Sequence, residues 1–422
     1  MLKKINITIL LIIFFASLSI AGGKIVTLKN GAVLIENKRD YNPTFSLVIM
    51  IKGGIFRENH ENNGIGNLAL NSWEKSSKLL KVVEDLGGAF NTSNLSDFSE
   101  ISLSIPSKYL DEILPLLQEF LTNIKIDKDI FENEKRITLI KLKAIQDRPD
   151  ELAIKSFMKA TYGSFPYAMD TLGEIETVKK LTINDAENFI KNLLQAKNMV
   201  VSIAGFYSEK QKNILTDIIS KLPKGEKFQI KCEKSNIEND KIVEKPHPNI
   251  KQAKLFMGYT APDATNEDYV PVKILSEVLG GGMSSIYFNI LRKEKGYAYS
   301  VGSFYPSKLC NSRFVNYIGL DYKNVKDALA TFDEIGKNAE KYINNEKVDK
   351  AKNYLTGRIL MEAQTNYKNA WYAAFFETLG LGGRFFDNYI SSIENTSTEE
   401  VIKAAKKYLS GHKTVFILKG EN

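Results

Sequence analysis

The stretch LGGGMSSIYFNILRKEKGYAYS, residues 279–300, carries the densest group of local signals in the chain. Its three successive glycines can end one helix and turn the backbone closely into the next, which Ser284 or Ser285 can cap. Arg292 and Tyr299 follow, and at this spacing both side chains could reach one point and hold a carbonyl or carboxylate group. The alternative interpretation is a glycine-rich turn followed by a surface arginine and a strand tyrosine.

The length and composition indicate a globular protein with more than one domain. The chain has 422 residues, of which 43% are hydrophobic and 25% are charged, and one core rarely serves so long a chain. The net charge is +7, but lysines are mixed with acidic residues over many predicted helix faces, as on a solvated surface. The composition therefore gives no sign of a nucleic-acid-binding protein.

The first residues have the pattern of a secretory signal peptide. Lys3-Lys4 precedes an almost unbroken apolar run over residues 5–20, and Ser19-Ile20-Ala21 supplies a cleavage site with small residues. We therefore expect residues 1–21 to be removed and the mature chain to be exported to the periplasm of a Gram-negative bacterium, or secreted. The alternative is an uncleaved membrane anchor. Because no later apolar run is long enough to cross a membrane, we expect no stable membrane span after cleavage.

The two cysteines, Cys232 and Cys310, do not form the framework of a disulfide-rich protein. They could pair in an exported protein. However, Cys232 stands in a lysine-rich stretch typical of a linker, and Cys310 stands in a predicted loop. The sequence therefore favours two unpaired thiols.

Helical and strand periodicities recur in the two halves of the chain. Asn30-Gly31 marks a hairpin at the start, and the apolar run 45–51 predicts a buried strand. In the first half we expect strands at 25–28, 32–35, 45–51, 90–93, 99–105 and 199–205 and helices at 66–73, 76–86, 107–123, 129–147, 151–162 and 182–194. In the second half we expect strands at 253–259, 299–304, 314–320 and 414–418 and helices at 269–278, 325–342, 345–362, 367–379 and 398–409.

This recurrence predicts an internal repeat of about 200 residues. Between the repeats, residues 221–250 are dominated by Lys, Glu, Asn and Pro and are interpreted as an interdomain linker. The predicted division is therefore an N-terminal domain over 22–220, the linker, and a C-terminal domain over 251–422. The expected fold class is α+β, with each domain a mostly antiparallel sheet that has helices packed on one side.

Five landmarks in order resemble the pitrilysin/insulinase metallopeptidases, the inverzincins, and above all their short branch similar to mitochondrial processing peptidase. They are residues 64–66, 87–92, 147–149, 280–285 and 291–300. Each landmark is weak alone, but the combination is specific, and the resemblance covers nearly the whole mature chain. It implies two homologous domains that together form half of a clamshell.

The resemblance also shows where this sequence departs from the family. Family members carry H-x-x-E-H on a first-domain helix, in which two histidines bind zinc and the glutamate activates water. Here the histidine positions are Asn67 and Asn71, and the glutamate position is Leu70. The stretch 140–143, where the resemblance places the last carboxylate ligand, reads Ile-Lys-Leu-Lys. Amides are poor zinc ligands and a nearby lysine repels the metal, so we expect no metal or other cofactor in this chain.

The substrate-binding part of the family's site is retained. The resemblance assigns Arg292 and Tyr299 to the pair that binds the substrate backbone near the scissile bond and stabilises the oxyanion. It also identifies the edge strand with Phe90, Asn91 and Thr92 as the one beside which a substrate adds as an extra strand.

Three functions follow from this combination. The leading hypothesis is an exported, zinc-free subunit of a heterodimeric zinc metallopeptidase, inactive alone. Its Arg292 and Tyr299 would act in trans on unfolded or extended peptides at the site of a zinc-bearing paralogous subunit. The second hypothesis is a non-enzymatic peptide-binding or assembly protein. The third, a self-sufficient zinc metalloendopeptidase, requires a metal site that the sequence lacks.

Overall fold

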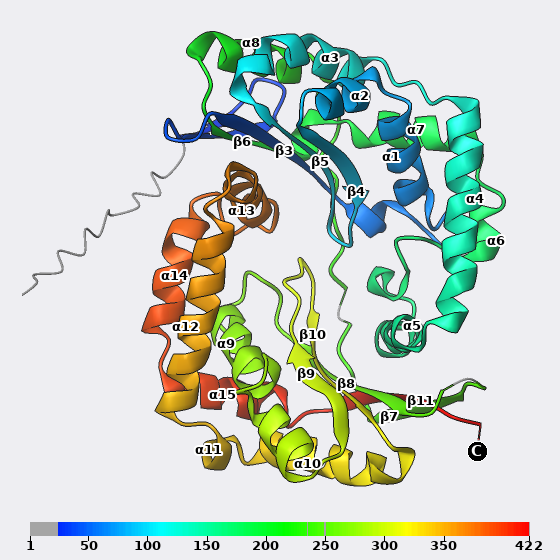
Figure 1. The fold of residues 1–422 in the computed structure, drawn as a ribbon, viewed down its shortest axis with the longest axis vertical. Coiled ribbons are helices and arrows are strands. Elements are labelled where there is room, and N and C mark those ends of the chain that lie inside the picture. Colours follow the sequence, from blue (N-terminus) through cyan, green and yellow to red (C-terminus); the bar gives the residue numbers. More distant parts are fainter. Residues whose placement is uncertain (1–23, 234, 249, 422) are drawn as a thin grey trace, which may run out of the picture.

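The computed structural model describes residues 24–233, 235–248 and 250–421 (Figure 1). The predicted signal peptide, residues 1–21, lies outside the described residues. Two mixed sheets lie at opposite ends of the molecule, each with helices packed against it. The predicted fold class, a two-domain α+β protein, is confirmed. Within the described ranges, none of the helices combines the length and hydrophobicity needed to cross a bilayer.

The first sheet has six strands in the order β1-β2-β6-β3-β5-β4. Among the described strands of this sheet, only β2 and β6 pair in parallel, and β6 joins the sheet after α1 to α7. The predicted hairpin is confirmed: β1 pairs with β2, and Gly31 takes a left-handed conformation (φ 96°) that favours glycine. The strands are β1 Lys24–Thr27, β2 Val33–Lys38, β3 Thr44–Lys52, β4 Ala89–Asn94, β5 Phe98–Pro106 and β6 Met199–Gly205.

Helices of the first half pack on the outer face of this sheet and extend away from it. Helix α3 is amphipathic, with its apolar face in the first core, whereas α4 is a long charged helix beside α1. The helices are α1 Ile65–Lys75, α2 Lys78–Asp85, α3 Leu110–Thr122, α4 Lys128–Ala144, α5 Pro149–Tyr162, α6 Ile175–Val178, α7 Ile183–Leu193 and α8 Glu209–Ser220.

The second sheet has five strands in the order β7-β11-β8-β10-β9. The predicted single helix over 325–342 is interrupted at Asn338, whose backbone is not helical, and α14 was not predicted. The strands are β7 Lys241–Pro246, β8 Ala253–Ala261, β9 Ala298–Phe304, β10 Ser312–Leu320 and β11 Lys413–Lys419. The helices are α9 Tyr269–Gly280, α10 Val325–Lys337, α11 Ala339–Tyr342, α12 Asn345–Glu362, α13 Asn366–Thr378, α14 Phe385–Asn395 and α15 Thr398–Tyr408.

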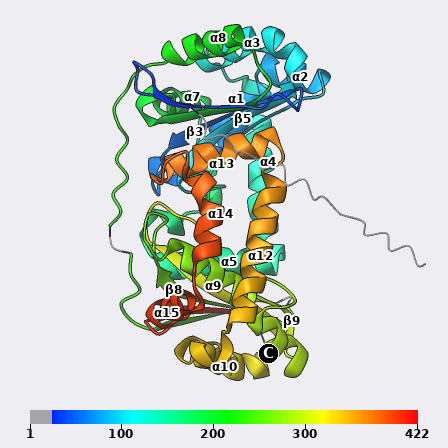
Figure 2. The ribbon, with the colours of Figure 1, turned by 90° about the vertical axis from the view of Figure 1, so that its left-hand side faces the viewer.

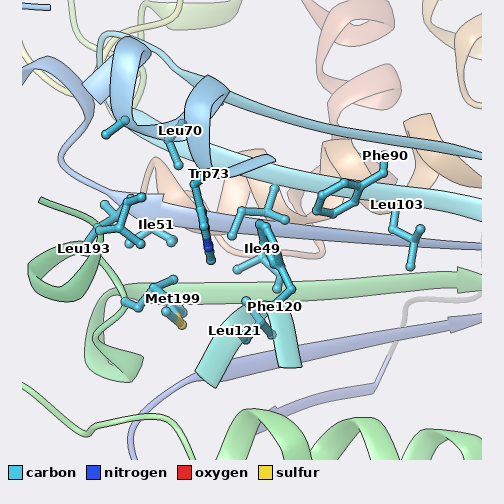
Figure 3. Packing of buried hydrophobic residues seen from close by; sticks show 14 of the residues in the cluster. Ile49, Ile51, Leu70, Trp73, Phe90, Leu103, Phe120, Leu121, Leu193 and Met199 are labelled. Carbon is cyan, nitrogen blue, oxygen red and sulfur yellow. The ribbon is translucent and has the colours of Figure 1, made fainter. Parts of the chain in front are cut away.

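Strand β3 is buried on both faces, as its apolar run predicts. Alternate side chains, including Ile49 and Ile51, enter the first core under the helices of this half (Figure 3). The intervening side chains, including Val48 and Met50, pack against α13, which comes from the second half of the chain. Figures 1 and 2 both show α13 lying against this sheet. The second half therefore covers the inner face of the first sheet.

The first half of the chain also contributes a helix to the second sheet: α5 packs on β8 and β11. Phe157 of α5 is fully buried and stacks on Phe256 of β8, with ring centroids 5.7 Å apart. A Cβ atom on the neighbouring Gly258 would lie 2.4 Å from the tip of the Phe157 ring. Glycine is therefore required there for the close approach of α5, and each half of the chain completes the packing of the other.

The segment predicted as linker folds onto the second half of the chain. Its residues 241–246 form β7, which pairs in parallel with β11. Cys232, in its irregular part, forms a disulfide with Cys310, which lies between β9 and β10. The prediction of two unpaired thiols is therefore wrong. The two cysteines are 78 residues apart in the sequence. At this separation, no local pattern indicates that the linker folds back onto the β9–β10 loop.

Replacing both Cys232 and Cys310 by serine is expected to lower the free energy of unfolding by about 2–4 kcal/mol, because the disulfide closes a long loop in the unfolded chain. Urea denaturation of the wild-type protein with and without dithiothreitol provides the measurement. The double variant should behave like the reduced wild type and should not respond to dithiothreitol. Identical midpoints for oxidised and reduced wild type would contradict the expectation.

Candidate functional site

The degenerate zinc motif lies on α1, a helix that packs against β4 and α4. Asn67 and Asn71 stand one turn apart as predicted, and Asn71 Nδ2 donates a 2.9 Å hydrogen bond to Asn67 Oδ1. Leu70 is fully buried and points into the first core (Figure 3). One hydrogen bond thus joins the two side-chain amides, and the position of the water-activating glutamate is part of the apolar core.

The start of α1 is held by a buried carboxylate. Glu58 accepts hydrogen bonds from the amides of Gly64 and Gly66 and from the side chains of Asn63 and Asn94, at 2.7–3.2 Å. Burial raises the pKa of Glu58 to about 7, although these hydrogen bonds oppose the shift. The orientation of the helix that carries the degenerate motif is therefore fixed from its first turn.

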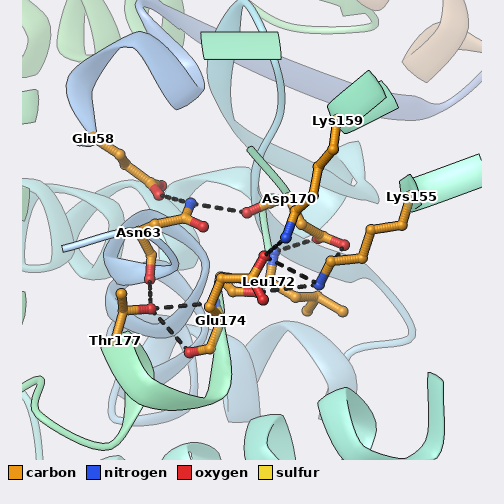
Figure 4. A network of polar contacts seen from close by, with 9 residues as sticks. Glu58, Asn63, Lys155, Lys159, Asp170, Leu172, Glu174 and Thr177 are labelled. Carbon is orange, nitrogen blue, oxygen red and sulfur yellow. Dashed lines mark hydrogen bonds and ion pairs between the residues drawn. The ribbon is translucent and has the colours of Figure 1, made fainter. Parts of the chain in front are cut away.

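A wider polar network braces the same region (Figure 4). Asn63 Nδ2 also donates to the carbonyl of Asp170, and Thr177 Oγ1 donates to the carbonyl of Asn63. Lys159 of α5 forms a 2.6 Å ion pair with Glu174. The network therefore connects the loop before α1 with α5, the helix that covers the second sheet.

The residues of α4 do not complete a zinc site. Ile140 is 54% exposed, Lys141 is exposed, and Glu134 is occupied by a 2.7 Å ion pair with Lys75. In the described part of the chain, there is no group of three or more His, Cys, Asp or Glu residues that could hold a metal ion. Since neutral amides, leucine and lysine are not the donors that zinc takes, the residues present do not fit the family's metal.

Arg292 and Tyr299 lie together at the edge of the second sheet. Arg292 belongs to η6, a π-helical segment over Phe288–Glu294, and Tyr299 is on the edge strand β9. The register against β10 shifts between Ala298 and Ser300, which makes Tyr299 the extra residue of a bulge. Its carbonyl oxygen accepts a 2.8 Å hydrogen bond from Arg292 Nη1. The structure therefore places the Arg292 guanidinium against the backbone of Tyr299, whereas the sequence predicted that the two side chains reach one point.

Both side chains of this pair are accessible. Tyr299 is 74% exposed, and Arg292 is also exposed, with its guanidinium 5.0 Å from the centroid of the Phe288 ring. A guanidinium has several N–H donors in a fixed plane, so it can bond the Tyr299 carbonyl and still present donors to a ligand. The predicted cap is also present, as Ser285 Oγ accepts a hydrogen bond from the amide of Phe288.

The predicted peptide-binding strand β4 is an edge strand, next only to β5 in its sheet. Of its three predicted site residues, Phe90 and Thr92 are 2% and 7% exposed, and Phe90 points into the first core (Figure 3). Asn91 is exposed on the opposite face. The side chains of Phe90 and Thr92 are therefore packing residues, and what β4 offers to a peptide is its backbone.

Sequence reasoning missed Glu74, the residue that contacts this backbone. Its carboxylate accepts a hydrogen bond from the amide of Thr92. The available signal was its spacing: Glu74 follows Asn71 by three residues on α1, so both lie on one helical face.

The fold and the site define the class of protein: a two-domain metallopeptidase fold without zinc ligands that has kept an exposed arginine–tyrosine pair. Residues 33–175 match the family model described as insulinase (peptidase family M16), and residues 180–355 match the model described as the peptidase M16 inactive domain. The chain therefore belongs to peptidase family M16, and the residues at its zinc-motif positions are not zinc ligands.

Three relatives illustrate this membership. A Rickettsia felis protein described as an uncharacterized zinc protease is 26% identical over 413 residues, which cover 93% of this chain and 96% of the relative. A Helicobacter pylori protein described as the non-peptidase homologue YmxG is 24% identical over 330 residues, which cover 76% and 74%. The crystal structure of a peptidase M16 inactive domain from Pseudomonas fluorescens superposes with a TM-score of 0.86 at 20% identity, covering 95% of this chain and 98% of that one.

Proposed function

We propose that this chain is the exported, zinc-free subunit of a heterodimeric zinc metallopeptidase. The observation that carries the proposal is the contrast between the two parts of the family's site. Asn67, Leu70 and Asn71 have lost the zinc chemistry, whereas Arg292 and Tyr299 are exposed and joined by a hydrogen bond. Because the zinc-motif positions of this chain carry no zinc ligands, a pair of this kind would act at the zinc site of another chain.

In the proposed complex, a paralogous subunit would supply the zinc chemistry needed to hydrolyse an extended peptide. This chain contributes donors that hold the peptide backbone and stabilise the oxyanion as the negative charge develops. Because Arg292 is exposed on η6, the segment beside the edge strand β9, it can reach a site that a facing subunit presents. The Cys232–Cys310 disulfide supports the export part of the proposal, since disulfides persist mainly in oxidising compartments.

Reconstitution tests this proposal. The chain without residues 1–21 is purified alone and together with a zinc-bearing paralogue from the same organism, and cleavage of a quenched fluorescent peptide library is followed. We expect cleavage by the mixture, little by the paralogue alone, none by this chain alone, and no stoichiometric zinc in this chain by mass spectrometry. Full activity of the paralogue alone, or chelator-sensitive proteolysis by this chain alone, would overturn the proposal.

A non-enzymatic peptide-binding protein is the second candidate function. It is favoured by β4, an edge strand whose backbone can pair with an added strand without any metal. A chain that binds extended peptides in calorimetry but does not activate the zinc-bearing paralogue would support this function.

A further inference from the structure

Strand β4 presents a limited set of backbone groups to an added strand. The β4–β5 hairpin is closed by a hydrogen bond from the amide of Leu95 to the carbonyl of Phe98, and antiparallel pairs alternate between bonded and non-bonded along the ladder. Residues 89, 91 and 93 therefore pair with β5, while the backbone groups of 90, 92 and 94 face away from it. Thr92 lies in the middle of this outward-facing set.

The middle donor of this set is already occupied. The amide of Thr92 donates its hydrogen bond to Glu74 Oε2 of α1, the helix packed beside β4. A charge-assisted hydrogen bond of this kind is stronger than one between neutral groups. A peptide strand that pairs with β4 needs the same amide for one of its carbonyl oxygens, so the peptide and Glu74 compete for one donor.

The surroundings of the Glu74 side chain allow it to move away from the amide of Thr92. Burial raises the pKa of its carboxyl above the ordinary value, and the negative charge of Glu134 acts in the same direction, against the hydrogen bond from Thr92 and the charge of Lys75. Glu134 also forms a 2.7 Å ion pair with Lys75. Glu74 is only partly buried, so its side chain can turn to water without disrupting the core.

We propose that Glu74 is an internal competitor that closes the peptide-binding edge of this chain and must move away before an extended peptide can pair with β4. The inference rests on the proposed function only in assigning extended peptides as ligands. It adds a regulated step: Glu74 lowers the affinity for every extended peptide in the same way, because it competes for backbone and not for a side chain.

Fluorescence anisotropy with fluorescein-labelled oxidised insulin B chain, an extended peptide, tests the proposal on the isolated chain. Glu74→Ala frees the Thr92 amide and is expected to lower Kd about 10-fold or more, the effect of one charge-assisted hydrogen bond. Glu84→Ala, an exposed glutamate on α2, is the matched control and should bind as the wild type does. Adding Thr92→Pro to Glu74→Ala removes the donor at an edge position that accepts proline, and Kd should return at least to the wild-type value.

Hydrogen–deuterium exchange gives a second measurement that does not depend on affinity. In the free protein, the segment 89–94 should exchange faster in Glu74→Ala than in the wild type, and added peptide should slow this exchange. Equal affinities of wild type and Glu74→Ala, including no detectable binding by either, overturn the proposal. These assays contain no zinc-bearing subunit, so the competitor role of Glu74 can fail while reconstituted proteolysis still supports the subunit role, and the reverse.

Discussion

Replacing Arg292 by alanine is expected to lower kcat of the reconstituted complex by about 10²- to 10³-fold, the loss that follows removal of one oxyanion donor. The guanidinium is held in place on two sides, by its hydrogen bond to the carbonyl of Tyr299 and by the Phe288 ring. Such positioning means that the donor does not have to reorganise as charge develops on the substrate. Initial rates with a fluorogenic peptide at saturating concentrations of both subunits provide the measurement.

Two variants separate this role from a general effect of charge. Lys293→Ala removes the neighbouring exposed cation and should leave kcat within about twofold of the wild type, because exposed charges act weakly at a distance. Tyr299→Phe removes one hydroxyl donor but keeps the carbonyl that holds Arg292, so it should lower kcat without changing assembly of the complex in size-exclusion chromatography. If Arg292→Ala and Tyr299→Phe leave full activity in an intact complex, the pair has no role in catalysis.

The elements that sequence reasoning predicted well are those determined by local patterns. The run 45–51 is apolar at every position except Ser46 and is buried on both faces of β3. Asn30-Gly31 forms the predicted turn between β1 and β2. Asn67 and Asn71 stand one turn apart on a helix, and this separation alone brings their amides within hydrogen-bonding distance. Neighbours along the chain are sufficient to determine each of these features.

The features that were missed depend on contacts between distant parts of the chain. Periodicity indicates that both faces of β3 are covered, but not that α13 covers one of them. The disulfide joins Cys232 to Cys310 because the linker folds back onto the β9–β10 loop. Glu74 was recognisable as a neighbour of Asn71, whereas its hydrogen bond to Thr92 required the position of α1 over β4. Such long-range contacts are determined by tertiary packing, and local patterns in a single sequence do not reveal them.

The largest expected effect on stability comes from a substitution in α5, the helix of the first half that packs on the second sheet. Phe157→Ala should lower the free energy of unfolding by about 3–5 kcal/mol, since it removes a fully buried phenyl ring and leaves a cavity. The ring lies between α5 and β8 over Gly258, which has no side chain to fill the space. Ile154→Ala on the same helix is the matched control: Ile154 is 37% exposed, so its loss should cost much less.

This prediction also tests whether the two halves unfold together. Trp73 and Trp371 both lie against the first sheet, whereas Phe157 packs on the second sheet, so tryptophan fluorescence reports on a region away from the substitution. If α5 and α13 couple the two halves, Phe157→Ala should lower the urea midpoint measured by tryptophan fluorescence and the one measured by far-ultraviolet circular dichroism by the same amount. Two separated transitions, with an unchanged midpoint by tryptophan fluorescence, would mean that the packing of α5 and α13 does not couple the domains and that each domain is stable alone.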